Sequence, residues 1–149
     1  MLAAAPHSTA YGCYSCTFMS QKHCKIVCWN VRGLNAPAKK EAVKLLMQQH
    51  KPTVVCLQET KLQDVSKNCI VQILGPNYQN ILFFLPADCT RGGFILAADD
   101  NYYRLSQCEL KSFSLTTKIV MRETNDAWTI TVVYGPQQDA EKIAFLQEL

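Results

Sequence analysis

Residues 25–59 read KIVCWNVRGLNAPAKKEAVKLLMQQHKPTVVCLQE, and this stretch decides the fold. Two short apolar runs, Lys25–Asn30 and Thr53–Glu59, each close on a polar residue, which is typical of strands buried on both faces. Between them the apolar residues recur at helical spacing, so we expect a helix over Ala38–His50, with Pro37 suited to its opening. The stretch therefore predicts a compact strand–helix–strand unit.

A strand–helix–strand unit of this size fixes the direction of its strands. The two strands run parallel, we expect them to be neighbours, and the crossover between them is right-handed. Their carboxyl ends then lie at one edge of the sheet, which is where ligands usually bind in open α/β sheets. Those ends carry Asn30 and Glu59, so this edge is the first candidate site.

The second half of the chain predicts mostly strands. Apolar and polar side chains alternate along Phe113–Met121, which favours a half-solvated antiparallel strand, and Asn125-Asp126 makes a turn into the next strand. A new helix is expected from Asp139 to Leu149. The strands expected in this half are Ile81–Leu85, Phe94–Ala98, Phe113–Met121 and Trp128–Tyr134.

Composition indicates one globular domain. Hydrophobic residues make up 48% of the chain and charged residues 18%, which excludes a disordered chain. We expect a flexible leader over residues 1–23 and a single domain over residues 24–149. The start of the chain lacks the positive charge of a secretory signal, and no apolar run is long enough to cross a bilayer. We therefore expect an intracellular protein, nuclear or cytoplasmic, that is not secreted and has no membrane partner.

Charge is distributed unevenly along the chain. Residues 1–67 hold nine Lys and Arg against three acidic residues, a net charge of +6. Residues 68–149 hold six against nine, a net charge of −3. A basic front half suits a polyanionic partner such as nucleic acid, because Lys and Arg release counterions from phosphates. A solvated surface explains the same charges, so both interpretations stay open.

Eight cysteines raise the possibility of disulfides or zinc. Disulfides are not expected in a reducing compartment, and Cys28, Cys56 and Cys69 lie in or beside apolar runs, where a free thiol behaves as a small core residue. Four residues follow the order of the ligands in a zinc knuckle: Cys13, Cys16, His23 and Cys28. The gap before the histidine is too long for that pattern and the last cysteine lies inside a predicted strand, so zinc is not expected.

Three predicted strand ends carry groups with useful chemistry. Glu59 offers carboxylate oxygens, the ligand type that magnesium prefers. Asn30 is suited to orient a phosphate oxygen or to share the metal's outer shell, and Tyr134 to donate a hydrogen bond to a phosphate. Such residues are more often exposed or capping residues, so these three alone leave the function open.

Four short motifs nevertheless occur in a familiar order, and they resemble the opening motifs of the endonuclease/exonuclease/phosphatase superfamily. The similarity covers Cys24 to Leu149 and is greatest to the endonuclease domain of non-LTR (LINE-type) retrotransposons, itself similar to abasic-site DNA endonucleases. The motifs are Trp29–Asn35, Leu57–Lys61, Arg91-Gly92-Gly93 and Val133–Pro136. The resemblance implies an α/β fold, the N-terminal portion of a four-layer α/β/β/α sandwich in which two packed mixed sheets are flanked by helices, truncated at the C-terminus.

The resemblance also implies roles for individual residues. Glu59 would bind a divalent ion, Mg²⁺ or Mn²⁺, and Asn30 would belong to the metal and phosphate network. Tyr134 would contact the scissile phosphate, so that Tyr134 and Asn30 are the catalytic candidates. Arg32 is typical of the retrotransposon branch, and Lys61 either touches the substrate backbone or is simply solvated. The paired glycines of the third motif have a structural role.

The downstream family motifs, an Asp-x-Asn pair and a Ser-Asp-His group, do not occur in this sequence. We therefore expect a truncated Mg-dependent DNA endonuclease that is inactive by itself. We also expect an exposed apolar sheet face, including Trp128, Ile130 and Val132, which would favour self-association. The alternatives are a DNA-binding fragment without catalysis, a retroelement remnant without selected function, and a phosphatase ancestry with a small or lipid phosphoester as substrate.

Overall fold

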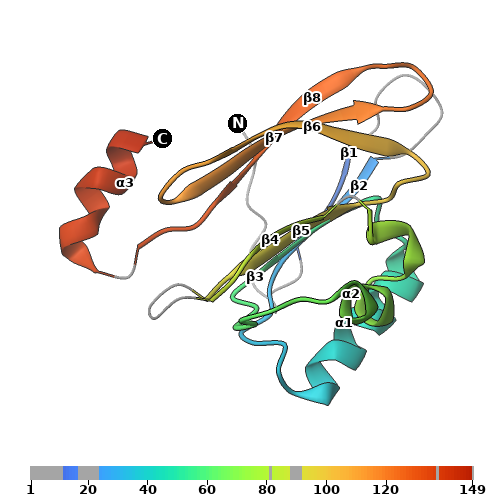
Figure 1. Cartoon of the computed structure of the whole chain (residues 1–149), viewed down its shortest axis with the longest axis horizontal. Coiled ribbons are helices and arrows are strands. Elements are labelled where there is room, and N and C mark those ends of the chain that lie inside the picture. Colours follow the sequence, from blue (N-terminus) through green and yellow to red (C-terminus); the bar gives the residue numbers. More distant parts are fainter. Residues whose placement is uncertain (1–11, 17–23, 81, 88–91, 137, 149) are drawn as a thin grey trace.

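Two packed sheets and two helices on one side of them form the body of the molecule in a computed structural model (Figure 1). The structure describes residues 12–16, 24–80, 82–87, 92–136 and 138–148, with the backbone alone for residues 12–16. The strands are β1 (Gly12–Cys16), β2 (Cys24–Asn30), β3 (Val54–Gln58), β4 (Leu82–Leu85), β5 (Phe94–Ala98), β6 (Tyr103–Leu110), β7 (Ser114–Met121) and β8 (Ala127–Val133). The α-helices are α1 (Pro37–His50), α2 (Lys67–Ile73) and α3 (Lys142–Glu148), and the 3₁₀ helices are η1 (Pro76–Tyr78) and η2 (Asp139–Glu141).

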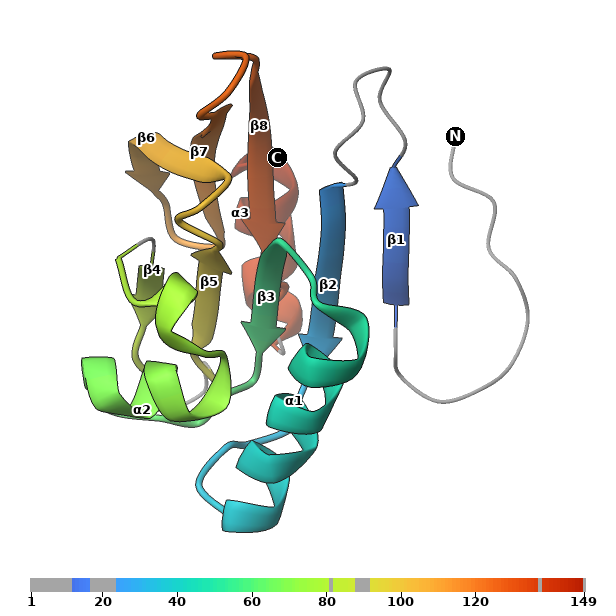
Figure 2. The same cartoon turned by 90° about the vertical axis from the view of Figure 1, so that its right-hand side faces the viewer.

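The first sheet is mixed and has the strand order β1-β2-β3-β5-β4, which Figure 2 shows side by side. β2 and β3 are parallel neighbours, with Asn30 opposite Gln58 at their carboxyl ends, and α1 connects them. This confirms the predicted strand–helix–strand unit. The remaining neighbours in this sheet pair antiparallel.

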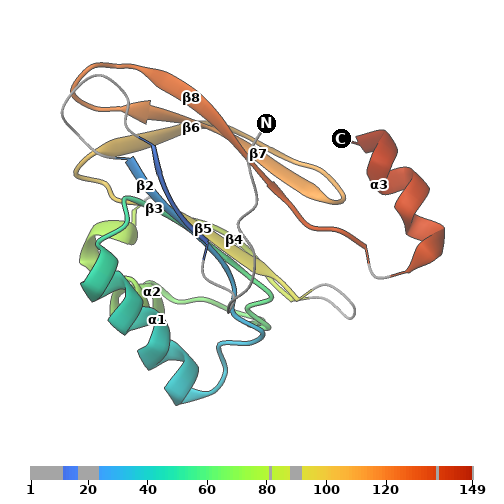
Figure 3. The same ribbon diagram turned by 180° about the vertical axis from the view of Figure 1, so that it is seen from behind.

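Helices α1 and α2 cover the outer face of the first sheet (Figure 3). α1 buries Val43 and Met47 against the sheet, and α2 buries Ile70 and Ile73 in the same core cluster. The side chain of Ser66 caps α2 by accepting a hydrogen bond from the Cys69 amide at 3.2 Å, which supplies one of the partners that the first turn of a helix lacks. The packing holds the carboxyl ends of β2 and β3 in place.

The second sheet lies on the opposite face of the first and has the order β6-β7-β8. Its three described strands pair antiparallel, as the alternation along Phe113–Met121 and the turn at Asn125-Asp126 predict, because each strand follows the previous one through a short turn. A core between the sheets contains Cys56, Leu96, Leu115 and Ile119.

The apolar face of β8 is less exposed than the sequence suggests. Val132 is buried, and Trp128 and Ile130 are half-buried and pack against the core between the sheets. The expectation that these three side chains are exposed is therefore wrong, because the second sheet lies directly over the first and covers them. The large apolar side chains of the described residues that do face solvent include Ile143 and Leu146 of α3.

α3 extends beyond the end of the second sheet (Figure 3) and contacts it at one point. Glu148 accepts hydrogen bonds from the Phe113 amide at 2.9 Å and the Ser114 hydroxyl at 2.8 Å. Desolvation is the largest single influence on the Glu148 carboxyl and raises its pKa, but the hydrogen bonds together outweigh it and hold the pKa below its usual value. The Phe145 ring meets Phe113 edge-on, with 5.7 Å between ring centres. Within the described residues, no helix has the length and hydropathy of a membrane span.

The predicted leader over residues 1–23 lies mostly outside the described residues, but its described part, β1, is a strand that pairs antiparallel with β2. The zinc ligand set considered above also depends on side chains outside the described residues, those of Cys13, Cys16 and His23.

Candidate functional site

The four sequence motifs meet at one edge of the first sheet, and backbone hydrogen bonds link them in sequence. The Gly33 amide donates to the Glu59 carbonyl at 2.6 Å, which ties the loop after β2 to the loop after β3. The Lys61 amide donates to the Gly92 carbonyl at 2.6 Å. The Gly92 amide in turn donates to the hydroxyl of Tyr134 at 2.6 Å. The structure therefore assembles one site from segments more than a hundred positions apart in the chain.

Tyr134 and Glu59 form the centre of this site. The Tyr134 hydroxyl donates a hydrogen bond to Oε1 of Glu59, although the two residues are 75 positions apart. Tyr134 follows β8, and its own amide donates to the Phe113 carbonyl at 2.7 Å, which positions the side chain at the rim of the second sheet. The Glu59 side chain is only 16% exposed. Both sheets thus contribute to one carboxylate environment.

Gly92 is the third component, because nothing larger than hydrogen fits at its α-carbon. A β-carbon built there would overlap the Glu59 carboxylate, with both oxygens closer than any real contact. Its neighbour Gly93 has φ +72° and a β-carbon there would lie 2.8 Å from the Leu85 carbonyl oxygen. The structural role inferred for this glycine pair therefore has two causes: room for the carboxylate at Gly92, and a left-handed backbone at Gly93. Arg91 of the same motif lies outside the described residues.

Three residues around the site adopt left-handed backbone conformations although they are not glycine. Arg32 has φ 49°, Glu59 φ 56° and Lys61 φ 55°. Each such residue costs of the order of 1–3 kcal/mol, and such residues persist where the surroundings over-determine them, often at functional sites. Here the hydrogen bonds from Gly33 to Glu59 and from Lys61 to Gly92 impose them.

Asn30 lies on the neighbouring strand end, two residues before Arg32. Its side-chain oxygen accepts a hydrogen bond from the Arg32 amide at 3.2 Å, and the side chain is exposed. This bond stabilises the turn after β2, so the capping interpretation of Asn30 is correct in this structure, and the exposed amide remains accessible to a ligand. Lys61 places its ammonium nitrogen 4.0 Å from Oε2 of Glu59 and is 60% exposed.

Two side chains of the site carry oxygen atoms of the type that magnesium prefers. No group of three His, Cys, Asp or Glu side chains in the described part of the chain lies close enough together to hold a metal ion. The site offers one carboxylate, Glu59, and one exposed amide oxygen, Asn30. Magnesium commonly binds through one or two carboxylates and completes its shell with water and phosphate oxygens. The residues present fit such an ion and do not fit a metal held by protein ligands alone.

Two further features at this edge of the sheet could not be predicted from the sequence. Gln58 donates from its side-chain amide to the Val133 carbonyl at 3.0 Å, a second bridge between the sheets beside the one from Tyr134. The hydroxyl of Thr60 is fully buried and has no hydrogen-bond partner. Both residues flank Glu59, and only their position next to a motif residue would have singled them out.

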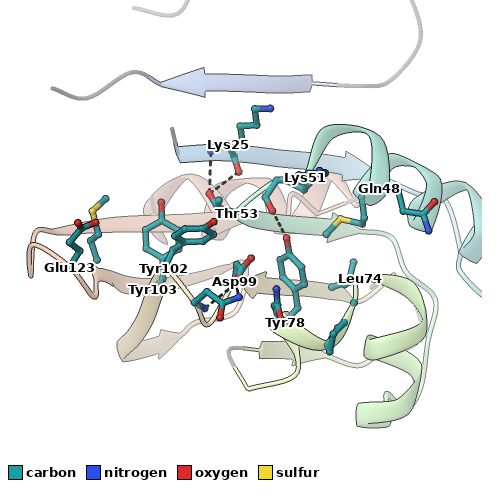
Figure 4. Close-up of a pocket in the computed structure, with 17 residues that line it drawn as sticks. Lys25, Gln48, Lys51, Thr53, Leu74, Tyr78, Asp99, Tyr102, Tyr103 and Glu123 are labelled. Carbon is teal, nitrogen blue, oxygen red and sulfur yellow. Dashed lines mark hydrogen bonds between the residues drawn. The ribbon is translucent and has the colours of Figure 1, made fainter. Parts of the chain in front are cut away.

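A pocket of about 610 Å³ lies at the opposite edge of the first sheet, where β2 and β3 begin (Figure 4). It is lined by Lys25 of β2, by Thr53 just before β3 and by Asp99 just after β5. Tyr78 of η1 and Tyr102 of the turn before β6 complete this side of the lining. None of the residues singled out by the sequence lines this pocket. We assign the site to the strand ends rather than to this pocket, because the strand ends unite the four motifs.

A model described as the Endonuclease/Exonuclease/phosphatase family matches residues 27–146. No curated protein matches the chain. The matched range includes Asn30, Glu59, Gly92 and Tyr134, the residues that the structure brings together or places on neighbouring strand ends.

Proposed function

This chain belongs to the endonuclease/exonuclease/phosphatase family, and from that premise we propose that it carries the front part of a magnesium-dependent DNA endonuclease of the non-LTR retrotransposon type. The observation that carries the proposal is the hydrogen-bonded set of Tyr134, Glu59 and Gly92. It holds a carboxylate at the edge where ligands bind in such sheets.

Glu59 and Asn30 are the residues that would hold the divalent ion, Mg²⁺ or Mn²⁺. When bound, such an ion supplies a positive charge that stabilises the charge developing on a phosphodiester. The protein's own contribution is orientation. The Tyr134 hydroxyl donates a hydrogen bond to the Glu59 carboxylate, and it accepts a hydrogen bond from the Gly92 amide. In this arrangement Tyr134 positions the carboxylate, and it must rotate before it donates to a phosphate.

Lys61 and Arg32 supply the positive charge expected around a phosphate backbone. Both are exposed and lie in the two loops that the Gly33–Glu59 hydrogen bond ties together. Lys61 faces Glu59 closely enough to neutralise part of its charge. Cations at the rim of a site bind phosphates without sequence preference, which suits a backbone contact rather than base recognition.

We also propose that these residues do not turn over substrate by themselves. Hydrolysis needs an oriented water and a base as well as charge stabilisation. Among the described residues, the site has a single carboxylate and no imidazole, since His50 ends α1 at the opposite edge of the sheet. The removal of members of a catalytic unit usually costs several orders of magnitude in rate.

The test is the effect of magnesium on binding to a labelled DNA duplex at fixed ionic strength. We expect magnesium to raise the affinity of the wild-type chain and to have no effect on Glu59→Gln. Glu41→Gln, on the exposed face of α1, is the matched control and should behave as wild type. The wild type and Glu41→Gln should nick supercoiled plasmid no faster than Glu59→Gln does, because we propose that the chain has no hydrolytic activity by itself. Equal magnesium effects in wild type and Glu59→Gln would refute the metal role of Glu59.

A second candidate is nucleic-acid binding without a metal. It is favoured by exposed lysines of the front half that lie on α1, at the start of α2 and on the loops between them: Lys39, Lys51, Lys61 and Lys67. In that case DNA affinity falls steeply with salt and is the same in wild type, Glu59→Gln and Glu41→Gln, whether or not magnesium is present. A salt-independent affinity would exclude this candidate.

A further inference from the structure

Two cysteines face each other across the parallel strands that lead to the site. Cys28 on β2 is the register partner of Cys56 on β3. Register partners of parallel neighbours project from the same face of the sheet, and Cys56 packs in the core between the two sheets. The neighbouring Cys56 thiol lowers the pKa of the Cys28 thiol to about 7, against an opposing effect of burial. Their direct pairing in the register makes them a thiol pair rather than two isolated cysteines.

The register places the pair at a spacing that a disulfide can span. Adjacent strands lie about 4.8 Å apart, and a disulfide spans α-carbon separations of about 4.4–6.8 Å. Access is divided between the partners: Cys28 is exposed, whereas Cys56 is 2% exposed. An oxidant in solution can therefore reach the first sulfur, and the second needs only to reach its neighbour.

We propose that Cys28 and Cys56 are a redox modification site that hydrogen peroxide converts to a cross-strand disulfide, which thiols reduce again. In the first step the Cys28 sulfur attacks a peroxide oxygen, an S–O bond forms, the O–O bond breaks, and the thiol proton leaves with the departing oxygen as water. In the second step the Cys56 sulfur attacks the sulfenic acid at Cys28. The S–S bond forms, the S–O bond breaks, and a second water takes the Cys56 proton. Two thiols lose two electrons and the peroxide gains them.

The location gives the modification a consequence for the candidate site. β2 continues from Cys28 to Asn30, and β3 continues from Cys56 to Glu59 through Gln58. A disulfide here joins the two strands close to the ends that carry both candidate ligands. In a reducing compartment such a bond is transient, which is the behaviour of regulatory rather than structural disulfides. The inference does not depend on the proposed nuclease chemistry.

The sequence allows the pair to be mapped without ambiguity. Trypsin releases Cys28 in the peptide Ile26–Arg32 and Cys56 in the peptide Leu45–Lys61, since the bond before Pro52 is not cut. Each peptide contains one cysteine. The folded chain is treated with a series of hydrogen peroxide concentrations, alkylated and digested, and the peptides are identified by mass spectrometry.

We expect the two peptides to be recovered cross-linked, with loss of free thiol at both positions and full recovery of both after dithiothreitol. Oxidation in urea should spread the cross-links over many cysteine pairs, because the fold no longer selects one. Cys28→Ser should abolish the cross-link, and because this residue is exposed the variant should still fold. Cys69→Ser, on α2 at the other face of the sheet, should leave it intact. The proposal would be overturned if both peptides were recovered separately alkylated from a sample in which the exposed Cys108 is already oxidised. It would also be overturned if Cys28 or Cys56 formed a cross-link to a different cysteine in the folded chain.

Discussion

The hydroxyl of Tyr134 donates a hydrogen bond to the carboxylate of Glu59 and so ties the end of β8 to the end of β3 across two sheets. The same hydroxyl accepts the Gly92 amide, which leaves that amide unpaired if the oxygen is removed. A hydrogen bond to a charged group contributes about 1.5–3 kcal/mol. We therefore expect Tyr134→Phe to lower the free energy of unfolding by about 1–3 kcal/mol, measured by denaturant titration.

The matched control is Tyr102→Phe, which removes a hydroxyl from a tyrosine that is 40% exposed and far from the strand ends. This change should have little effect on the unfolding midpoint. If both variants lose the same stability, the Tyr134 hydroxyl has no special connection to Glu59.

Gly92→Ala should be costly for a different reason. A β-carbon at this position overlaps the Glu59 carboxylate, so either the carboxylate or the strand start must move. Overpacking of this kind typically costs about 1–3 kcal/mol, measured by the same titration. Gly135→Ala is the control, because its β-carbon would meet only the Phe145 ring at 4.0 Å. A Gly92→Ala variant as stable as Gly135→Ala would contradict the geometry at Glu59.

The fold could be predicted from the sequence where the apolar pattern of a strand or helix is clear. The two apolar runs and the helix after Pro37 predict the correct parallel pair. Burial on both faces holds for β3 but is wrong for β2, where only Val27 is buried, because β2 lies farther from the centre of the sheet. β6 was missed because it is an exposed strand interrupted by a bulge, with Gln107 at φ 56°. α2 was missed because its seven residues are too few to show a helical period.

The candidate site too could be predicted in part from the sequence. Glu59 and Tyr134 were singled out from their strand ends and their motifs, and the structure brings them into contact. Their mutual hydrogen bond was not foreseen, because two strands in different sheets have no register that a sequence reveals. Asn30 was expected in a metal and phosphate network, but its side-chain oxygen stabilises the local turn at Arg32. A role for Asn30 with a ligand stays a prediction.

Buried tyrosines predict a loss of stability at alkaline pH. Burial raises the pKa of Tyr103 to about 12, with a hydrogen bond to Cys24 adding to the shift, and burial also raises the pKa of Tyr78. Because these values exceed the unfolded value of about 10, the native state favours the protonated phenols. Their contribution is complete below about pH 10 and is lost as the pH rises toward about 12. The free energy of unfolding should fall over that interval, and less steeply in Tyr103→Phe. Identical slopes would show that Tyr103 ionises as easily in the folded state as in the unfolded one.

Magnesium should stabilise the folded chain through Glu59. A ligand that binds only the native state raises the free energy of unfolding with its concentration, by about 1.4 kcal/mol at ten times its dissociation constant. Glu59 and Asn30 lie on neighbouring strand ends, and Tyr134 already orients the carboxylate, so the ion would bind a site that is largely formed. Near-ultraviolet circular dichroism should therefore show a thermal midpoint that rises with magnesium in the wild type and stays constant in Glu59→Gln. Glu41→Gln, which removes an exposed carboxylate from α1, should rise as the wild type does. A rise of equal size in Glu59→Gln would assign the stabilisation to general ionic effects and leave Glu59 without a metal.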